Sequence, residues 1–553
     1  MATRTPTPEQ AGIIATKLEP GQVMVVNAVA GSGKTSTLQM YVDAYPEKKF
    51  LYLAFGKAQA DEAKDRFSQN AECRTTHSLA YRETGAPYAK NKQKGIGSEP
   101  RGKAIMEPLG IKLPWMANMT IATLSKYLQS ADPEIAAHHL PDYAQYKPVE
   151  DQIIVKKKAE QLWQKMCDRN DGSVPMSHDG YLKLWQLECL RSGKVPKVFY
   201  QYDAILLDEA QDTNPTVEAI LGQIIAQGSH AVILVGDERQ AIYQWRGAVN
   251  MMGRLSESIK SADIDGVKRS LTESFRYGPR VADVAAKILS LGCEKKAAIT
   301  GRGKDEPNVT NGSRCYLART NAALMDQAIA TLDGNPHGIL HFAGTSSISR
   351  YDPTVPYKLH FIRSVFHYFA NERHLATDPT IKRYEDWNDI LQHAYGGENH
   401  DQEAGDKELA AAVKFVEKHR YQTLSVLDLI VSRSGEPQRA IASFSTAHRA
   451  KGLEWDHVAL LDDFISLGSE MDRNEDGELQ LPDEQELNLL YVAVTRGRKW
   501  VELNQDLAEF VESEFPHHFE ELRPSRVLER AKERTTAEFS TRSLTTALSA
   551  THG

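Results

Sequence analysis

A glycine-rich turn that leads into a lysine and a threonine is the strongest chemical signal in this sequence. The segment AVAGSGKT at 28–35 follows an apolar run, VMVVNA at 23–28, and precedes TSTLQMYV, which has the spacing of a helix. A turn between a strand and a helix presents backbone N–H groups and the positive end of the helix dipole to a phosphate. We therefore expect a nucleotide site here, and a plain strand-to-helix turn built from small residues is the weaker alternative.

Each residue of this turn has an expected task. Gly31 and Gly33 allow the tight turn. Lys34 would reach the β and γ phosphates, and Thr35 would bind Mg²⁺. The first glycine of the usual pattern is Ala28 here, so the motif is a variant. The other loop residues expected to contact the nucleotide are Ala30, Ser32 and Ser36.

Two adjacent carboxylates supply the acidic metal ligand and the general base that the phosphate loop lacks. The segment LLDEAQD at 206–212 places Asp208 and Glu209 directly after an apolar run. Asp208 would bind the metal, and Glu209 would position and deprotonate the attacking water. Such a pair after a strand is usually a solvated strand end, but together with the phosphate loop it predicts hydrolysis of a nucleoside triphosphate.

Short apolar runs that end in small or acidic residues recur along the chain. Such continuous apolarity indicates strands whose sheet is covered on both faces, as in a parallel α/β core. Functional residues then lie at the carboxyl ends of the strands. Two stretches, about 88–190 and 335–440, have helical periodicity instead, so we expect them to be insertions into two α/β cores. The runs are VMVVNA at 23–28, FLYLAF at 50–55, AILLDEA at 204–210, AVILVGD at 231–237 and HVALLDDF at 457–464.

Composition limits the class of protein. The chain has 553 residues, of which 41% are hydrophobic and 25% are charged, and this excludes collagen-like and wholly disordered classes. The net charge is −8, so a nucleic-acid partner would have to bind in a local groove. Most of that charge lies in residues 470–486, which hold eight Asp or Glu against one Arg and are expected to form a solvated loop.

The sequence also predicts a cellular location. No apolar stretch approaches the roughly 20 residues that span a bilayer, and the start MATRTPTPEQ lacks the apolar core of a secretory signal. The five cysteines form no C-x-x-C pair, so we expect reduced thiols and no zinc site. An intracellular, cytoplasmic protein is expected, with a nuclear location still open and without a membrane partner.

Ten sequence blocks in a fixed order carry a family resemblance. VGDERQAIYQWRGA at 235–248 is not a generic ATPase element, and with DEAQD before it the chain strongly resembles the UvrD/Rep/PcrA-type superfamily 1A DNA helicases. Details at 52–67, 75–81 and 176–184 are most similar to the branch of the F-box DNA helicases, although no F-box-like region is evident here. Besides GSGKT, the further blocks are TPEQ at 7–10, LAFGKAQADEAKDRF at 53–67, TTHSLAY at 75–81, LTESFRYG at 271–278, LARTN at 317–321, STAHRAKGLEWDHV at 445–458 and ELNLLYVAVTRGR at 486–498.

The resemblance implies a fold as well as a family. We expect an α/β protein with two RecA-like parallel-sheet cores of the P-loop class, each carrying a mainly helical insertion. ATP would be bound between the two cores. The expected boundaries are 1–87 and 191–267 for the first core, 88–190 for its insertion, 268–334 and 441–523 for the second core, 335–440 for its insertion, and 524–553 for a flexible tail.

The resemblance also assigns residues to the nucleotide. Gln10 would hydrogen-bond the adenine, Phe275 would stack on it, and Gln240 would sense the γ phosphate. Two arginines of the second core would act as fingers, because the charge on the transferring phosphoryl group needs cations. A glutamate of the KGLEW block would face the nucleotide from the same core. These three residues are Arg276, Arg496 and Glu454.

Contacts to single-stranded DNA should come from aromatic side chains that stack on bases of any sequence. Trp245 and Tyr243 are the strongest candidates, with Arg246 beside them. Three further assignments are weaker, because a lone aromatic beside a strand is more often core and a lone histidine is more often structural. These are Phe55, His77 and His448.

Taken with the residues, the resemblance implies an ATP-dependent helicase that moves 3′→5′ on single-stranded DNA and acts at single-strand/duplex junctions. Repair, recombination and replication are the expected settings, with recombinase or replication proteins as partners. One alternative is a translocase that mainly strips recombinase or other proteins from DNA. Another is an inactive DNA-binding scaffold or defence-system subunit, against which the full set of catalytic residues argues.

Overall fold

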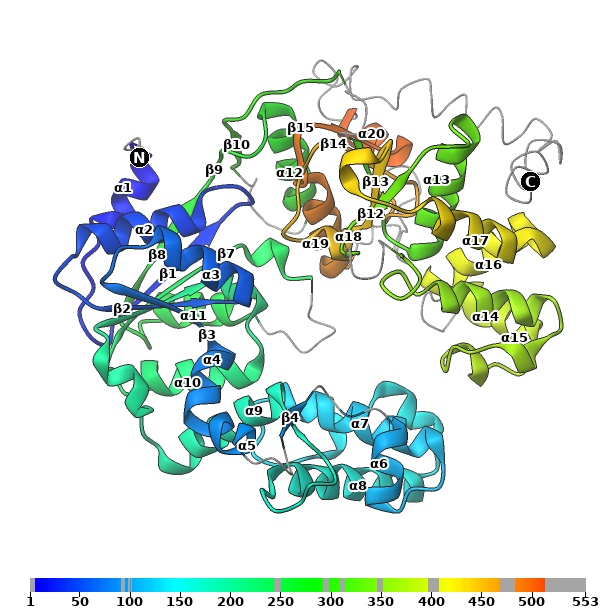
Figure 1. The fold of residues 1–553 in the computed structure, drawn as a ribbon. Helices are drawn as coiled ribbons and strands as arrows, with labels where there is room; N and C mark the ends of the chain where they lie inside the picture. Colours follow the sequence, from blue (N-terminus) through cyan, green and yellow to red (C-terminus); the bar gives the residue numbers. More distant parts are fainter. Residues whose placement is uncertain are drawn as a thin grey trace, which may run out of the picture. The chain divides into compact units, whose positions relative to one another are not determined.

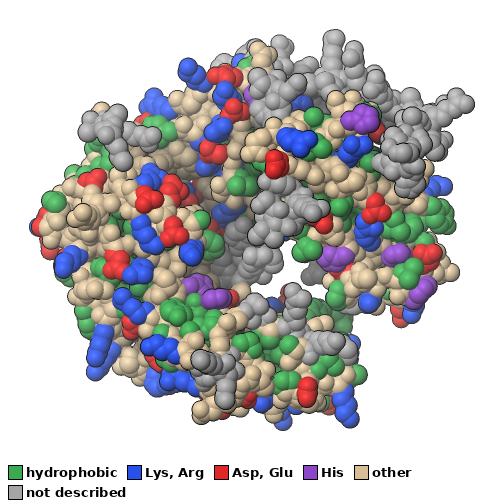
Figure 2. Space-filling model, in the orientation of Figure 1, with side chains coloured by type: hydrophobic (Ala, Val, Ile, Leu, Met, Phe, Trp, Pro, Cys, Tyr) green, Lys and Arg blue, Asp and Glu red, His purple; other side chains and the backbone are tan. Residues whose placement is uncertain are grey.

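The structure is a computed structural model. Its contacts divide the chain into two units, Met1–Thr272 and Glu273–Gly553, and each is described by itself. On the face drawn in Figure 2, basic and acidic side chains are interspersed, in keeping with totals of 66 basic and 74 acidic residues. The described residues are 5–90, 95–97, 100, 102–242, 250–291, 298–308, 314–345, 352–395, 407–467 and 483–512.

The first unit is built on a six-stranded parallel sheet with the order β3-β2-β6-β7-β1-β8. Its four inner strands, β2, β6, β7 and β1, are almost entirely buried, so neighbouring residues of one strand enter different cores. In β1, Val25 packs into one hydrophobic cluster and Val26 into another. The prediction that the apolar runs of this unit form covered strands is confirmed. The strands are β1 Val23–Ala28, β2 Phe50–Ala54, β3 Ala71–Thr75, β6 Ala204–Asp208, β7 Ala231–Gly236 and β8 Gly266–Leu271.

Helices cover this sheet on both faces (Figure 1). β8 pairs with β1 from Gly266 to Leu271, so the first unit extends to Thr272 and not to the expected boundary at 267. The physical reason is that a strand belongs with the sheet that supplies its hydrogen bonds. The covering helices are α1 Pro8–Ile14, α2 Lys34–Ala44, α3 Lys57–Arg66, α4 Thr76–Ala80, α5 Ala86–Ala89, α9 His178–Ser192, α10 Pro215–Ala226 and α11 Met251–Lys260.

The first insertion has a hydrophobic core of its own. α6 Gly102–Leu109, α7 Pro114–Leu128 and α8 Val149–Cys167 pack around residues such as Leu124 and Leu162. The following α9 instead contributes Leu182 and Trp185 to the core of the sheet. Two short strands, β4 Ile96–Gly97 and β5 Met176–Ser177, pair beside this junction.

Side chains of the core helices hold the insertion where α7 ends. The ammonium of Lys183 on α9, which is fully buried, donates to the carbonyls of Ser130 and Asp132 at 2.9 and 2.6 Å. The Thr216 hydroxyl on α10 donates to the carbonyls of Leu128 and Ser130. The Leu128 carbonyl ends α7 and has no partner within the helix, so Thr216 satisfies it, and the other contacts fix the segment that follows α7 to the core.

The second unit contains a five-stranded parallel sheet with the order β12-β13-β11-β14-β15. A two-stranded sheet, β9 Glu273–Ser274 with β10 Thr300–Gly301, lies beside α12 Pro279–Ser290. The five strands are β11 Arg314–Ala318, β12 Leu340–Phe342, β13 Ala442–Thr446, β14 Trp455–Leu460 and β15 Gly497–Glu502. The other helices outside the insertion are α13 Asn321–Gly334, α18 Ala447–Ala450, α19 Glu484–Val494 and α20 Gln505–Glu512.

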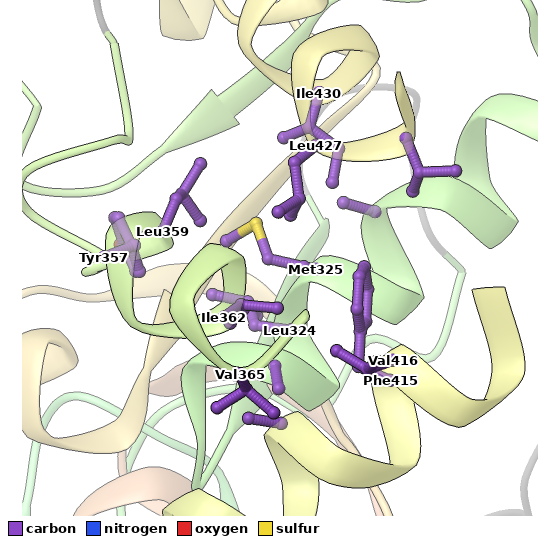
Figure 3. Packing of buried hydrophobic residues seen from close by; sticks show 14 of the residues in the cluster. Leu324, Met325, Tyr357, Leu359, Ile362, Val365, Phe415, Val416, Leu427 and Ile430 are labelled. Atoms are coloured by element: carbon purple, nitrogen blue, oxygen red, sulfur yellow. The ribbon is translucent and has the colours of Figure 1, made fainter. Parts of the chain in front are cut away.

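The second insertion shares its core with the sheet that it interrupts. One cluster joins Met325 of α13, Ile362 of α14 and Leu427 of α17 (Figure 3). Phe444 of β13 belongs to the same cluster. The insertion is thus a further helical layer of the second unit and not a separately packed body. Its helices are α14 Leu359–Phe369, α15 Trp387–Tyr395, α16 Lys407–His419 and α17 Thr423–Arg433.

The end of the acidic segment differs from the expected solvated loop. Residues 468–482 lie outside the described part of the chain, as do 513–553 with the predicted tail. Glu484 and Glu486, however, form the first turn of α19, where carboxylates are favoured by the helix dipole. Glu486 also accepts two hydrogen bonds from the Arg319 guanidinium, at 3.1 and 2.8 Å. Within the described ranges, no helix combines the length and apolarity needed to cross a membrane.

Because the second insertion and its sheet share one core, we expect them to unfold together. Leu427→Ala removes a fully buried side chain and should lower the free energy of unfolding by about 3–5 kcal/mol. In urea, followed by hydrogen exchange and mass spectrometry, peptides from α14–α17 and from β11–β15 should lose protection at the same concentration. The control Ser425→Ala, on the exposed face of the same helix, should stay within about 0.5 kcal/mol. Earlier loss of protection in the insertion alone would contradict the shared core.

Candidate functional site

The phosphate loop has the backbone that its sequence predicts. β1 ends at Ala28 and α2 begins at Lys34, with Gly31 at φ 77° and Gly33 at φ 80° between them. Positive φ is the conformation that glycine adopts without steric cost, so both glycines are needed for this turn. The hydroxyl oxygen of Ser32 is buried and has no hydrogen-bond partner among the described residues. The loop therefore holds one unsatisfied hydroxyl directly before a helix that begins at Lys34, and a helix N-terminus favours phosphate.

Asp208 is the centre of the site. It ends β6 and is 4% exposed, and its Oδ2 accepts a hydrogen bond from the Thr35 hydroxyl at 2.6 Å. Its Oδ1 accepts the backbone N–H of Glu209 at 2.9 Å. Burial raises the pKa of Asp208, and the nearby Glu209 carboxylate raises it further, whereas Thr35 and Lys34 act in the opposite direction. The two residues predicted to bind metal are thus in direct contact.

Glu209 is held by a strained backbone and by two side chains. Its φ of 53° and ψ of 44° place a non-glycine residue in the left-handed region. The Lys34 ammonium lies 3.3 Å from its Oε2, and the Gln211 side-chain amide donates to the same oxygen at 2.8 Å. Such strain clusters at functional sites, where the surrounding contacts maintain it.

Gln240 reaches the same edge of the sheet from β7. The strand ends at Gly236 and is followed by the 3₁₀ turn η6 Glu238–Gln240. The Gln240 amide donates to Asp237 Oδ2 at 2.8 Å, and Asp237 N–H donates to Gln211 Oε1 at 3.0 Å. Because β7 pairs with both β1 and β6, a network of side chains joins the ends of neighbouring strands.

Gln10 lies beside the helix that follows the phosphate loop. It is buried in α1, and its side-chain carbonyl accepts the N–H of Thr7 in a capping box. Its amide donates to the Thr37 hydroxyl on α2 at 3.0 Å. Ser36, which follows Thr35 at the start of α2, accepts a hydrogen bond from Arg66 of α3 at 3.2 Å. The Arg66 guanidinium of α3 therefore lies next to the residues that follow the phosphate loop.

In the second unit, the structure brings together the residues predicted to act on the nucleotide. Arg276 donates to a Glu454 carboxylate oxygen at 2.8 Å and to the backbone carbonyl of Thr495 at 3.3 Å. Arg496 is 1% exposed, and its guanidinium donates to the carbonyl of Val492 at 2.9 Å. Both arginines are therefore engaged within their own unit. Phe275, which precedes Arg276 in the sequence, is 51% exposed.

The candidate DNA contacts lie in different parts of the chain. Phe55 follows β2 and is 59% exposed, and it neighbours the end of β3, whose Thr75 pairs with Ala54. His77 in α4 pairs with Asp179 of α9 at 2.9 Å. His448 lies in α18 of the second unit. Three of the predicted contacts, Tyr243, Trp245 and Arg246, lie outside the described residues.

Two residues at the site carried no functional prediction from the sequence. Tyr52 donates its hydroxyl to Asp208 Oδ2 at 2.7 Å, and Gln211 links Glu209 to Asp237. Tyr52 lies inside an apolar strand. The one feature that could have pointed to a functional role is its hydroxyl, because a buried hydroxyl needs a hydrogen-bond partner. Gln211 is the glutamine of the DEAQD block and could have been chosen from its position next to the paired carboxylates.

The donor set at Asp208 fits Mg²⁺, which prefers oxygen ligands and binds through one or two protein groups together with phosphates. The Thr35 hydroxyl and the Asp208 carboxylate meet at 2.6 Å, beside the phosphate loop. Lys34 lies within reach of the same carboxylates. The residues present can therefore hold a nucleoside triphosphate with its metal.

Known helicases are similar to this chain in sequence. Residues 7–258 match the sequence model of the UvrD/REP helicase N-terminal domain. F-box DNA helicase 1 of Gallus gallus is 33% identical over 91% of this chain and 49% of its own length. F-box DNA helicase protein 1 of Schizosaccharomyces pombe is 28% identical over 92% of this chain and 58% of its own length. A mitochondrial ATP-dependent DNA helicase of Saccharomyces cerevisiae is 24% identical over 53% of this chain and 42% of its own length.

The matches support both the two-core α/β architecture and the branch that the sequence blocks indicated. The chain spans about half the length of the F-box helicases that it matches. Residues 7–258 of this chain thus match the UvrD/REP helicase N-terminal domain, and the chain is similar to the F-box DNA helicases over about nine-tenths of its own length.

Proposed function

We propose that this chain is an ATP-dependent DNA helicase that moves 3′→5′ along single-stranded DNA and opens single-strand/duplex junctions, in repair, recombination or replication. The observation that supports it most is the contact of Thr35 with Asp208, beside the pair formed by Lys34 and Glu209. These four side chains are the minimum for binding a metal–nucleotide complex and activating water. The match to a helicase domain supports DNA as the proposed substrate.

The chemistry of each residue follows from its contacts. The loop N–H groups and Lys34 would bind the phosphates, and bound Mg²⁺ would supply charge neutralisation there. Lys34 pairs with Glu209 at 3.3 Å. We propose that the phosphates take over this ammonium, which leaves the Glu209 carboxylate to accept the proton of the attacking water. Gln211 keeps that carboxylate in place meanwhile.

Further groups would complete the ATPase site. Gln240 is proposed to sense the γ phosphate, because Asp237 orients its amide at the carboxyl end of β7. Gln10 is proposed to bind the adenine and Phe275 to stack on it. Arg276 and Arg496 are proposed to act as arginine fingers once they exchange their present carboxylate and carbonyl partners for phosphate oxygens. Glu454 would release Arg276 in that exchange.

Single-stranded DNA would bind through stacking aromatic groups and polar groups that follow its backbone. Three of the proposed contacts, Tyr243, Trp245 and Arg246, follow Gln240 closely in the sequence. A movement of Gln240 on nucleotide binding or hydrolysis would therefore move these residues directly. Phe55 presents a largely exposed ring at the carboxyl end of β2. His77 and His448 are the remaining proposed contacts.

The first test is ATP hydrolysis with and without single-stranded DNA. We expect DNA to stimulate the wild type. Glu209→Gln, which removes the base, and Lys34→Ala, which removes a phosphate ligand, should each lower turnover about 100-fold or more. The control Lys17→Ala changes an exposed lysine of the same unit and should leave the rate unchanged. Wild-type behaviour of Lys34→Ala, with no stimulation by DNA, would favour an inactive scaffold.

The direction of movement is tested with duplexes that carry one single-stranded tail. A motor that moves 3′→5′ enters from a 3′ tail, so the 3′-tailed duplex should be unwound with ATP and the 5′-tailed duplex should not. Strand separation is followed by fluorescence, with Glu209→Gln as the inactive control. Unwinding of only the 5′-tailed duplex would disprove the proposed polarity.

The proposed stacking role of Phe55 predicts a loss of DNA affinity. Phe55→Ala should weaken binding of an oligothymidine by about 1–3 kcal/mol, or roughly 5- to 150-fold in Kd, measured by fluorescence anisotropy. Tyr200, which is 61% exposed in the same unit, provides the matched control. If Tyr200→Ala weakens binding as much as Phe55→Ala does, the ring of Phe55 has no special role.

A further inference from the structure

The side chain of Tyr52 joins the hydrophobic core to the centre of the nucleotide site. Tyr52 lies in β2, which pairs with β6, the strand that ends in Asp208. Its ring is 2% exposed and packs against Phe67, with 4.6 Å between the ring centroids. The hydroxyl donates to Asp208 Oδ2 at 2.7 Å. The ring is thus anchored in the core while its hydroxyl reaches the carboxylate.

Three donors fix the Asp208 carboxylate, and they are not equivalent. The Thr35 hydroxyl and the Tyr52 hydroxyl both donate to Oδ2, and the N–H of Glu209 donates to Oδ1. Thr35 is itself an expected ligand of the metal. Glu209 lies in the strained turn at φ 53°. Tyr52 alone among the three is held by a strand in the middle of the sheet.

A hydroxyl inside a buried strand is unfavourable unless it is paired. All five residues of β2 are buried, and the other four are apolar. A phenylalanine would fill the same volume without the hydroxyl's desolvation cost. The contact with Asp208, and not packing, therefore explains why this position of β2 carries a tyrosine.

We infer that Tyr52 is a positioning residue that holds the Asp208 carboxylate in the orientation needed to bind the metal of a metal–nucleotide complex. It would act through Asp208, to which its hydroxyl donates, and would not itself be a ligand of the nucleotide or the metal. This inference rests on the proposed ATPase function of the site. Removing the hydroxyl leaves Asp208 with fewer fixed contacts, so binding of Mg²⁺ should weaken while the groups that activate water remain.

The test is Tyr52→Phe, which deletes only the hydroxyl. The Mg²⁺ concentration that gives half-maximal ATP hydrolysis should rise about tenfold, which is the size expected for one hydrogen bond to a charged group. At saturating Mg²⁺, kcat should stay within about twofold of the wild type. A second readout is direct binding of Mn²⁺ in the presence of ADP, measured by electron paramagnetic resonance, and it should weaken by a similar factor.

Two controls separate positioning from packing. Tyr41→Phe removes the hydroxyl of another buried tyrosine in the same unit, which donates to the Thr16 carbonyl at 3.1 Å, and should leave the Mg²⁺ dependence unchanged. Phe67→Leu loosens the packing around the Tyr52 ring but keeps the hydroxyl. It should lower the melting temperature without shifting the Mg²⁺ dependence.

The outcomes distinguish this inference from the function on which it rests. If Tyr52→Phe binds Mn²⁺ and responds to Mg²⁺ as the wild type does, the inference is wrong. If Phe67→Leu shifts the Mg²⁺ dependence as much as Tyr52→Phe, the effect is one of packing and the inference is again wrong. A wild-type protein that binds Mn²⁺ with ADP but hydrolyses no ATP would instead overturn the proposed function, and Mn²⁺ binding would still decide the role of Tyr52.

Discussion

The burial of one carboxylate constrains most of the first unit. Asp208 is 4% exposed, and removing a carboxylate from water costs several kcal/mol unless hydrogen bonds and opposite charges replace its hydration. Thr35 and Tyr52 donate to one oxygen, and the N–H of Glu209 donates to the other. These donors come from the phosphate-loop helix, from β2 and from the turn after β6. All three elements must therefore be in register before the carboxylate can be buried.

The same requirement explains why polar side chains form a network at this edge. Parallel strands end together, so the residues that follow β6 and β7 meet across the sheet. The side-chain nitrogen of Gln211 donates to Glu209, and its side-chain oxygen accepts the N–H of Asp237. Each member restrains the next, and the strained conformation of Glu209 persists because its neighbours leave it little freedom. Such preorganisation is what water activation requires.

The two insertions are joined to their cores by different interactions. The first has its own hydrophobic core and is held at the end of α7 by hydrogen bonds from Lys183 and Thr216. The second shares a continuous core with α13 and β13. Polar contacts at a helix end leave room for local movement, whereas a shared close-packed core does not deform gradually. Any movement within the second unit should therefore involve insertion and sheet together.

Local sequence determined the strands, the phosphate loop and the paired carboxylates, because buried strands are continuously apolar and tight turns need glycine. It also determined the family, through short motifs in a fixed order. The boundary at Thr272, the helical end of the acidic segment and the shared core of the second insertion depend on pairing and packing between distant residues, which no local pattern records. The same holds for Tyr52, whose strand looks merely apolar in the sequence. Only the tertiary structure could show which buried group its hydroxyl meets, because Asp208 lies on a neighbouring strand far along the chain.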